Sequence, residues 1–277
     1  MEIKMVQISI EIITKGEATT EHVLKSISEQ TFKDYEVTCV NSSDNPMITE
    51  LLKKYGVNEI RVEKHTKALE ARYLANKNSH GKFRLLLDST RPLDEKALET
   101  LISKYGKFKA VSIREKSLGD GFWVRQAKIL KKLSEHSDVV KKGSKVAYLL
   151  PRFYREDVLS ASFKFLKTNI DERLFKEISY GEHHLIYDAA KMEPSDVVIT
   201  DEYLINHYED DSSKAIFRKY KWYGKSQKTL NQIKFDSSAK KLISHMRPIS
   251  FSTFIPMIET IPIRFLRTSA FMIGYIF

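Results

Sequence analysis

The sequence predicts an α/β protein with a mostly parallel sheet flanked by helices. Strand-like and helix-like segments alternate through the first hundred residues, which is the repeating unit of a doubly wound sheet. An apolar run at residues 85–87, bounded by Gly81 and Pro92, is typical of a buried parallel strand. The run stops on Asp88. Ligands of such sheets bind beyond the carboxyl ends of the strands, so Asp88 is expected at the mouth of a site, although a lone Asp there commonly caps the next helix instead.

The remaining elements follow from periodicity and from turn residues. β-branched or apolar runs predict strands, and apolar residues spaced along one face predict helices. The expected strands are residues 6–13, 35–40, 58–62, 85–88, 110–113 and 196–200. The expected helices are residues 20–30, 48–55, 69–78, 94–105, 122–136, 156–159 and 181–191. A polar turn at 41–46 ends in Pro46, and an extended segment at 149–155, interrupted by Pro151, leads into the helix at 156.

Composition limits the class of protein and its compartment. The chain has 277 residues, 42% of them hydrophobic and 30% charged, which suffices for one large domain with an appendage and excludes a disordered chain. Cys39 is the only cysteine, so no internal disulfide forms and a reducing compartment such as the cytoplasm is expected. Charged residues interrupt the N-terminal apolar stretch, so no signal peptide is expected.

The net charge of +10 is concentrated in one late segment. Residues 1–213 carry 34 Lys and Arg against 34 Asp and Glu, residues 214–247 carry ten against one, and residues 248–277 carry two against one. We therefore divide the chain into a main domain at 1–213, a basic aromatic helical segment at 214–247 and an amphipathic tail at 248–277. Aromatic residues interleaved with cations in the middle segment are typical of a helix that lies on an apolar, anionic surface.

The tail is strongly apolar but interrupted. Spanning a bilayer takes roughly 20 consecutive apolar residues, and only ten residues follow Arg267. The tail is expected to lie in a membrane interface rather than to cross the bilayer. The alternative is a hydrophobic closing helix pair packed on the domain or in a dimer interface.

Several short motifs occur together in a recognisable order. They are the opening strand, the stretch at 26–37, the turn Ser42-Ser43-Asp44-Asn45, Glu70-Ala71-Arg72, Leu86-Leu87-Asp88, the stretch at 150–155, Asp171-Glu172-Arg173-Leu174-Phe175, Gly181-Glu182-His183, His207 and the stretch at 219–226. In this order and spacing the chain resembles a family-two glycosyltransferase of the GT-A fold over most of residues 6–230. The resemblance implies transfer of a sugar from a nucleotide-sugar donor, such as a UDP- or GDP-sugar, to an acceptor hydroxyl.

The resemblance also implies a divalent cation, Mn²⁺ or Mg²⁺, held by an Asp-x-Asp motif. Asp88-Ser89-Thr90 occupies that position and keeps only the first Asp. A departing diphosphate needs either such a cation or fixed cationic side chains. His207 is the expected extra metal ligand, with a purely structural histidine as the alternative.

Four further residues are assigned to donor binding. By the resemblance, Asn41 replaces an Asp that contacts the base or ribose, Asp44 lies in the adjoining turn, and Arg72 approaches the base and phosphates, unless Arg72 is a plain surface residue. Glu11 interrupts an apolar strand; a buried carboxylate is costly unless paired, so it is expected to face the same cleft.

The general base is expected at the pair Glu182-His183, where the family commonly has Glu-Asp. An acceptor hydroxyl is a poor nucleophile until a base removes its proton. A histidine side chain is chemically able to remove this proton. If the register differs by one residue, Glu182 is the base instead. The alternative is that both are simply polar residues at the start of a helix, without a catalytic role.

These observations favour an inverting glycosyltransferase at the cytoplasmic face of a membrane, acting on a lipid-linked glycan, a glycolipid or a surface polysaccharide. The cations at 219–226 are expected to face the donor pyrophosphate, anionic lipid head groups, or both. The altered motifs leave open a second class, a catalytically weak or inactive GT-A-like protein that serves as a membrane-docked binding subunit. Nucleic-acid binding by residues 214–247 ranks last, and a homo-oligomer remains open.

Overall fold

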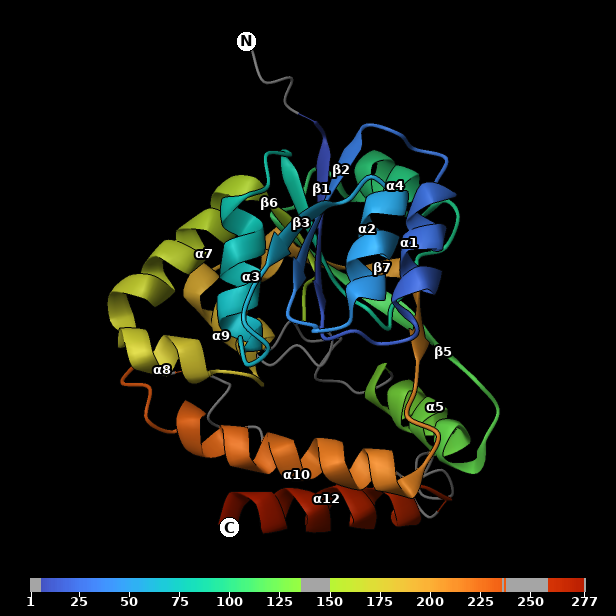
Figure 1. Ribbon diagram of the computed structural model, residues 1–277, viewed down its shortest axis with the longest axis vertical. Helices are drawn as coiled ribbons and strands as arrows, with labels where there is room; N and C mark the ends of the chain where they lie inside the picture. The colour runs from blue at the N-terminus through green and yellow to red at the C-terminus, as the bar shows by residue number, and fades with distance from the viewer. Residues whose placement is uncertain (1–5, 136–149, 236, 238–258, 277) are drawn as a thin grey trace.

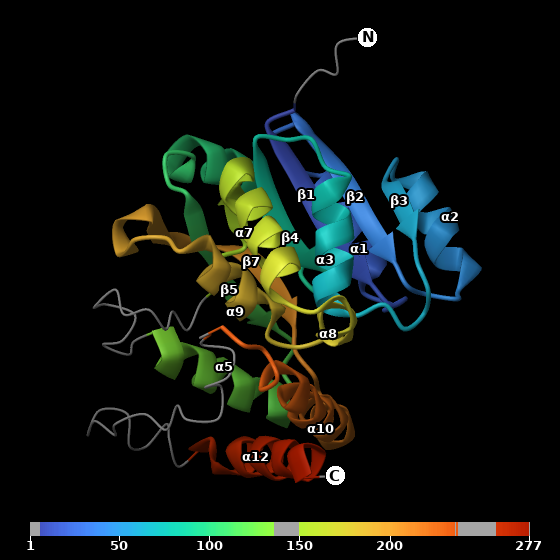
Figure 2. The ribbon, with the colours of Figure 1, turned by 90° about the vertical axis from the view of Figure 1, so that its left-hand side faces the viewer.

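A seven-stranded, mostly parallel sheet forms the centre of the molecule (Figures 1 and 2). The computed structural model describes residues 6–135, 150–235, 237 and 259–276. The strand order is β3-β2-β1-β4-β6-β5-β7, and β6 runs antiparallel to both of its neighbours. The strands are β1 (Ile8–Thr14), β2 (Tyr35–Asn41), β3 (Asn58–Arg61), β4 (Phe83–Asp88), β5 (Ala110–Leu118), β6 (Phe153–Arg155) and β7 (Val197–Tyr208). The predicted fold class is confirmed.

Helices cover both faces of this sheet. They are α1 (Thr20–Ser28), α2 (Pro46–Lys54), α3 (Ala68–Lys77), α4 (Ala97–Thr100), α5 (Phe122–Glu135), α7 (Glu156–Asn169), α8 (Glu172–Glu177), α9 (Glu182–Ala190), α10 (Ser213–Leu230) and α12 (Ile261–Ile276). In Figure 1, α1, α2 and α4 lie on one face, while α3, α7 and α9 lie on the other. Successive side chains of a strand point to opposite faces: Leu85 and Leu87 pack in the first core, and Leu86 packs in the second.

Several elements differ from the sequence-based expectation. β5 continues to Leu118 and α7 to Asn169, and the short helix α8 was not expected. The helix expected at 94–105 is a short α4 that continues as a π-helix over Leu101–Tyr105. The strand expected at 196–200 extends to Tyr208, because the additional residues pair with β5 as far as Leu118 across a register shift. This extension carries His207 to the same edge of the sheet as Asp88.

α10 and α12 form a parallel pair across the carboxyl ends of the central strands (Figure 1). Their backbones touch at two glycines: a Cβ on Gly224 would lie 2.0 Å from the Phe271 carbonyl oxygen, and one on Gly274 would lie 1.8 Å from that of Lys221. Only glycine permits this approach. α10 therefore has one side against the main domain and another against α12.

The apolar tail is thus packed, in its described part, as the closing helix of the domain. Its outward side nevertheless remains apolar, with exposed Ile261, Phe265, Met272, Ile273 and Ile276. Within the described residues, no helix is both long and apolar enough to cross a bilayer. Residues 238–247 of the predicted basic segment, residues 248–258 of the predicted tail, and residues 136 and 149 of two predicted elements lie outside the described residues.

Candidate active site

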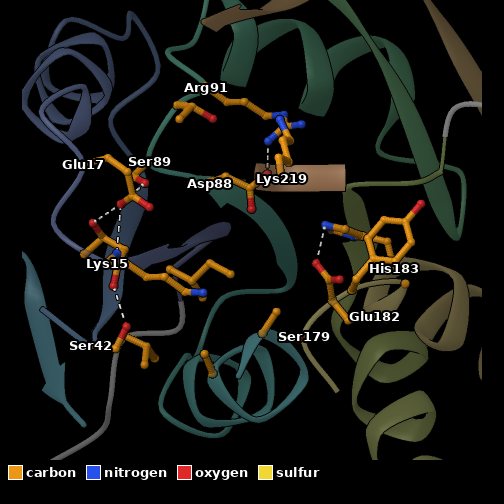
Figure 3. Close-up of a pocket in the computed structure, with 18 of the residues that line it drawn as sticks. Lys15, Glu17, Ser42, Asp88, Ser89, Arg91, Ser179, Glu182, His183 and Lys219 are labelled. Atoms are coloured by element: carbon orange, nitrogen blue, oxygen red, sulfur yellow. Dashed lines mark hydrogen bonds and ion pairs between the residues drawn. The ribbon is translucent and has the colours of Figure 1, made fainter. Parts of the chain in front are cut away.

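A pocket of about 390 Å³ lies where the carboxyl ends of β1, β2 and β4 meet α9 and α10. Figure 3 shows Asp88 between the loop that follows β1, with Lys15 and Glu17, and the start of α9, with Glu182 and His183. This is the position at which open α/β sheets bind ligands. Asp88, which the sequence places at the end of an apolar strand, is among the residues that line this pocket.

Asp88, the last residue of β4, is surrounded by guanidinium groups. Its Oδ1 accepts a hydrogen bond from Arg72, its Oδ2 pairs with Arg91, and Arg152 Nη1 lies 3.4 Å from the same Oδ2. Burial opposes ionisation, but Arg91, Arg72 and Arg152 hold the pKa of Asp88 well below its usual range. Asp88 is therefore ionised, and its charge is already compensated within the protein.

Glu115 of β5 holds two of the same arginines from the other side. Its Oε1 accepts from Arg91 Nε at 2.9 Å and from Arg152 Nε at 3.0 Å. Burial opposes its charge, yet Arg91 and Arg152 keep the pKa of Glu115 below its usual range. We call Arg72, Arg91 and Arg152, with Asp88 and Glu115, the arginine cluster: it carries three positive and two negative formal charges.

The loop after β1 connects the pocket to α10. The Glu17 carboxylate accepts from the Lys15 backbone N–H at 2.9 Å and from the Ser89 hydroxyl at 2.6 Å, which fixes the loop against the end of β4. Lys15 Nζ lies 5.0 Å from the centre of the Trp222 ring, a cation–π distance. Burial lowers the pKa of Lys15. Trp222, Tyr223 and Lys219 of α10 complete this wall of the pocket.

Glu182 and His183 begin α9, which follows Gly181 in the left-handed conformation at φ 80°. Burial, reinforced by the negative charge of Asp88 although Arg72 opposes it, raises the pKa of Glu182. Burial, together with Arg152 and Arg72, lowers the pKa of His183 well below its usual range. A carboxylate with a raised pKa is suited to accept a proton near neutral pH.

The hydrogen bonds of His183 limit what it can do. Its Nε2 lies 3.3 Å from Arg152 Nη1, and because a guanidinium only donates, this nitrogen is the acceptor. The proton of the neutral ring then resides on Nδ1, which is buried and has no hydrogen-bond partner among the described residues. Because Nε2 already accepts from Arg152 and Nδ1 already carries a proton, the neutral ring has no free lone pair, and Glu182 is the better placed base of the predicted pair.

His207 lines the pocket from β7, but its surroundings do not suit a metal site. Its Nδ1 lies 3.0 Å from Lys131 Nζ and 3.1 Å from Glu209 Oε1, and burial with Arg91 lowers its pKa to about 4. Among the described residues, no three His, Cys, Asp or Glu side chains are grouped to hold an ion. A divalent cation at Asp88 would also adjoin three guanidiniums. The residues present do not fit the expected Mn²⁺ or Mg²⁺.

The other predicted donor-site residues lie away from the described lining of the pocket. Asn41 is buried at the end of β2, where it donates to Glu59 at 2.6 Å. Asp44 is exposed and pairs with Lys64 at 2.5 Å. These contacts join the end of β2 and the loop after it to neighbouring segments, and neither residue belongs to the described lining of the pocket.

Arg72 and Glu11 correct two expectations. Arg72 is neither on the surface nor in the pocket, because it is fully buried beneath Asp88 and also donates to the Leu87 carbonyl at 2.6 Å. Glu11 was expected to face the cleft, but it lies in the core 3.4 Å from Arg84 Nε. Burial raises the pKa of Glu11 to about 7, with Arg84 partly opposing. Glu11 lies further from the carboxyl end of β1 than Ile13 and Thr14, the residues of this strand that line the pocket.

Sequence reasoning assigned no role to Arg91, Arg152 or Glu115. Arg91 had a local signal, since it follows the strand-terminal Asp88 by three residues. Glu115 had a weaker local signal. It is a buried residue in the second half of β5, where buried positions alternate with more exposed ones. Their convergence depends on the pairing of β5 with β6 and of β6 with β4, which short-range patterns do not contain.

A mostly parallel sheet with a cation-rich pocket at its carboxyl edge is the arrangement of a nucleotide-binding α/β protein. Residues 9–175, more than half of the chain, match the family model for glycosyl transferase family 2. The chain belongs to this family, and family and fold together support nucleotide-sugar glycosyl transfer. The resemblance noted from the sequence is confirmed.

Solved structures share the fold at low sequence identity. The mannosyltransferase PcManGT from Pyrobaculum calidifontis, in complex with GDP-Man and Mn²⁺, aligns over 98% of this chain and 86% of its own with a TM-score of 0.59 and 11% identity. S. aureus TarS 1-349 aligns over 97% of this chain and 89% of its own, with a TM-score of 0.51 and 15% identity. Its complex with UDP aligns over the same fractions of the two chains, with a TM-score of 0.50 and 14% identity. No curated protein sequence matches this chain. These likenesses show a GT-A-like fold.

Proposed function

We propose that the protein is an inverting glycosyltransferase that moves a sugar from a nucleoside diphosphate sugar, such as a UDP- or GDP-sugar, to an acceptor hydroxyl. One observation carries the proposal. A single pocket contains a cluster of guanidiniums suited to phosphate and, on its opposite side, a carboxylate with a raised pKa. Guanidinium groups match phosphate geometry, and such a carboxylate is a general base.

Each side of the pocket then has one chemical task. The acceptor oxygen forms a bond to the anomeric carbon of the sugar while the bond from that carbon to the diphosphate oxygen breaks. The acceptor proton passes to the Glu182 carboxylate, and the nucleoside diphosphate leaves with the bonding electron pair. Arg91 and Arg152 stabilise the negative charge that develops on it.

Donor binding and transfer test this proposal directly. Calorimetry with a panel of nucleotide sugars is expected to show binding of at least one of them, and transfer or hydrolysis of that donor is expected to need Glu182. Glu182→Gln is compared with Glu172→Gln, which changes an exposed residue of α8 paired with Lys176. Absence of binding across the panel would instead favour the inactive binding-subunit alternative.

The acceptor side of the proposal places the protein on an anionic membrane at its cytoplasmic face, with a lipid or glycan acceptor. The same helix, α10, lines the pocket through Lys219, Trp222 and Tyr223 and packs on α12, whose outward side is apolar. α10 carries exposed cations, Lys225 and Lys228 among them, and Lys228 Nζ donates to the Ile276 carbonyl of α12. Such a surface fits the head-group region of a bilayer and would bring a lipid-borne hydroxyl to the α10 wall.

Vesicle flotation tests the membrane surface. The full chain is expected to float with vesicles rich in anionic lipid, and the double variant Phe265→Ser with Ile276→Ser is expected to lose this binding. Met47→Ser is the matched control, since Met47 is 70% exposed and belongs to α2, which lies apart from α12 in Figure 1. Flotation that is unchanged in the double variant would contradict the assignment, and a dimer that dissociates instead would support the packing alternative.

A further inference from the structure

Fixed cations occupy the place at which the family resemblance expects a metal ion. The arginine cluster encloses Asp88, and Lys219 of α10 lines the same pocket (Figure 3). We infer that Arg91, Arg152 and Lys219 bind the donor diphosphate directly, so that this protein uses its nucleoside diphosphate sugar without a divalent cation. This inference rests on the proposed function and specifies how its donor site works.

Both arginines retain donors for a ligand. Arg91 uses Nε and Nη1 on Glu115 and Asp88, and Arg152 uses Nε on Glu115 and Nη1 on the Leu86 carbonyl and His183. Neither Nη2 group donates to another described residue. Both side chains line the pocket, so the Nη2 group of each guanidinium can donate a charge-assisted hydrogen bond to a phosphate oxygen.

The third cation comes from a different part of the chain. Lys219 Nζ pairs with Asp210 at 2.9 Å, and Tyr223 and Asp210 raise its pKa although burial opposes them. Lys219 is therefore charged at neutral pH. Lys219 lines the same pocket as Arg91 and Arg152, so a diphosphate bound there can also be contacted from α10.

Electrostatics disfavours a metal at this position. Like charges in contact near a protein surface repel one another strongly, and a divalent ion bound to Asp88 would lie next to the three guanidiniums that already contact this carboxylate. The carboxylate that would bind the ion already compensates those cations. A diphosphate is negatively charged, so the same guanidiniums attract it.

Asp88 and Glu115 then act as positioning residues rather than metal ligands. Each carboxylate contacts both Arg91 and Arg152, and together they fix the planes of the two guanidiniums. This assignment explains why the first Asp of the motif is retained while Thr90 replaces the second, which would be needed only to complete a metal site.

Calorimetric binding of UDP and GDP to the full chain, in excess EDTA and then in millimolar Mn²⁺ or Mg²⁺, tests the inference. We expect Kd in EDTA to equal that in metal within a factor of about two, because the cations that meet the phosphates belong to the protein. Mn²⁺ titration followed by electron paramagnetic resonance is expected to show no protein-bound ion in the absence of nucleotide.

Variants locate the site. Arg91→Gln is expected to weaken nucleotide binding in EDTA by about tenfold or more, since it removes a charge-assisted contact, while Arg91→Lys recovers part of the affinity. Arg155→Gln is the matched control, because Arg155 pairs with Phe83 at the opposite end of β4 from Asp88. Thermal melting checks that each variant is folded, and the metal comparison on the unaltered protein does not depend on any variant.

The outcomes separate the inference from the proposed function. Binding that requires metal, or that Mn²⁺ strengthens about tenfold or more, overturns the inference and leaves the function intact. Equal loss in Arg91→Gln and Arg155→Gln overturns the assignment to Arg91. No binding of any nucleotide or nucleotide sugar in either medium overturns both the function and the inference.

Discussion

The two sides of the pocket place carboxylates in opposite environments. On the β4 side, Asp88 is enclosed by guanidiniums that hold its pKa well below the usual range. On the α9 side, Glu182 is buried next to a weakly basic histidine, and its pKa is raised. Environments that move two titratable groups apart in one site commonly separate their chemical roles. Asp88 organises fixed positive charge, whereas Glu182 is available to take a proton.

The largest expected effect comes from removing the proton acceptor. Glu182→Gln keeps the shape of the side chain but cannot accept the acceptor proton, so kcat is expected to fall by about a hundredfold to ten-thousandfold. Donor Kd is expected to change little, because the phosphate contacts lie on the β4 side. Steady-state kinetics measures kcat, and calorimetry measures the donor Kd. A Glu182→Gln variant with normal kcat would contradict the assignment of Glu182 as the proton acceptor.

The same isosteric change on the β4 side is expected to affect stability instead. Asp88→Asn leaves the buried Arg72 and its neighbours without their carboxylate and should lower the free energy of unfolding by roughly 2 kcal/mol, since hydrogen bonds to charged groups contribute about 1.5–3 kcal/mol. Urea unfolding measures this loss. The control is Asp120→Asn, because the Asp120 side chain is fully exposed, and an equal loss in both variants would contradict the role of Asp88.

The pH profile of kcat/KM distinguishes the two members of the predicted base pair. Activity is expected to fall with acidity as Glu182 is protonated, with a midpoint above 4.5, the ordinary pKa of glutamate, because burial raises the pKa. His183→Gln is expected to keep this acid limb, and Glu182→Gln to abolish it. An acid limb that disappears in His183→Gln would return the base role to the histidine.

The smallest expected effect concerns a third buried carboxylate, Glu11, and is a change in the pH dependence of the free energy of unfolding. Its pKa is about 7 in the folded protein and 4.5 in the unfolded chain, so the native state binds more protons between these values. The free energy of unfolding should therefore fall as pH rises from about 4.5 to about 7, by at most roughly 1.4 kcal/mol per pH unit. Glu11→Gln is expected to flatten this slope, and Glu95→Gln, at an exposed position, to leave it unchanged.

Much of the fold could be predicted because its signals are local. The burial of Leu85–Leu87 and the alternation of strands and helices follow from apolar spacing, which each segment carries by itself. The lengths of β7 and α4 were less predictable, since β7 is extended by its pairing with β5. Among site residues, the strand end located Asp88 and the start of α9 located Glu182 and His183.

By itself, the sequence determined the sheet, the position of Asp88 at its edge and the family resemblance, because these depend on the order of residues along the chain. Only the tertiary structure decided that Arg72 lies beneath Asp88, that Glu115 joins Arg91 to Arg152, that Glu11 faces the core and that α12 packs on α10. Charge, burial and proton affinity depend on distances between segments remote in the chain. For that reason the altered motif at Asp88 could be recognised from the sequence, while the convergence of Arg91 and Arg152 on this carboxylate could not.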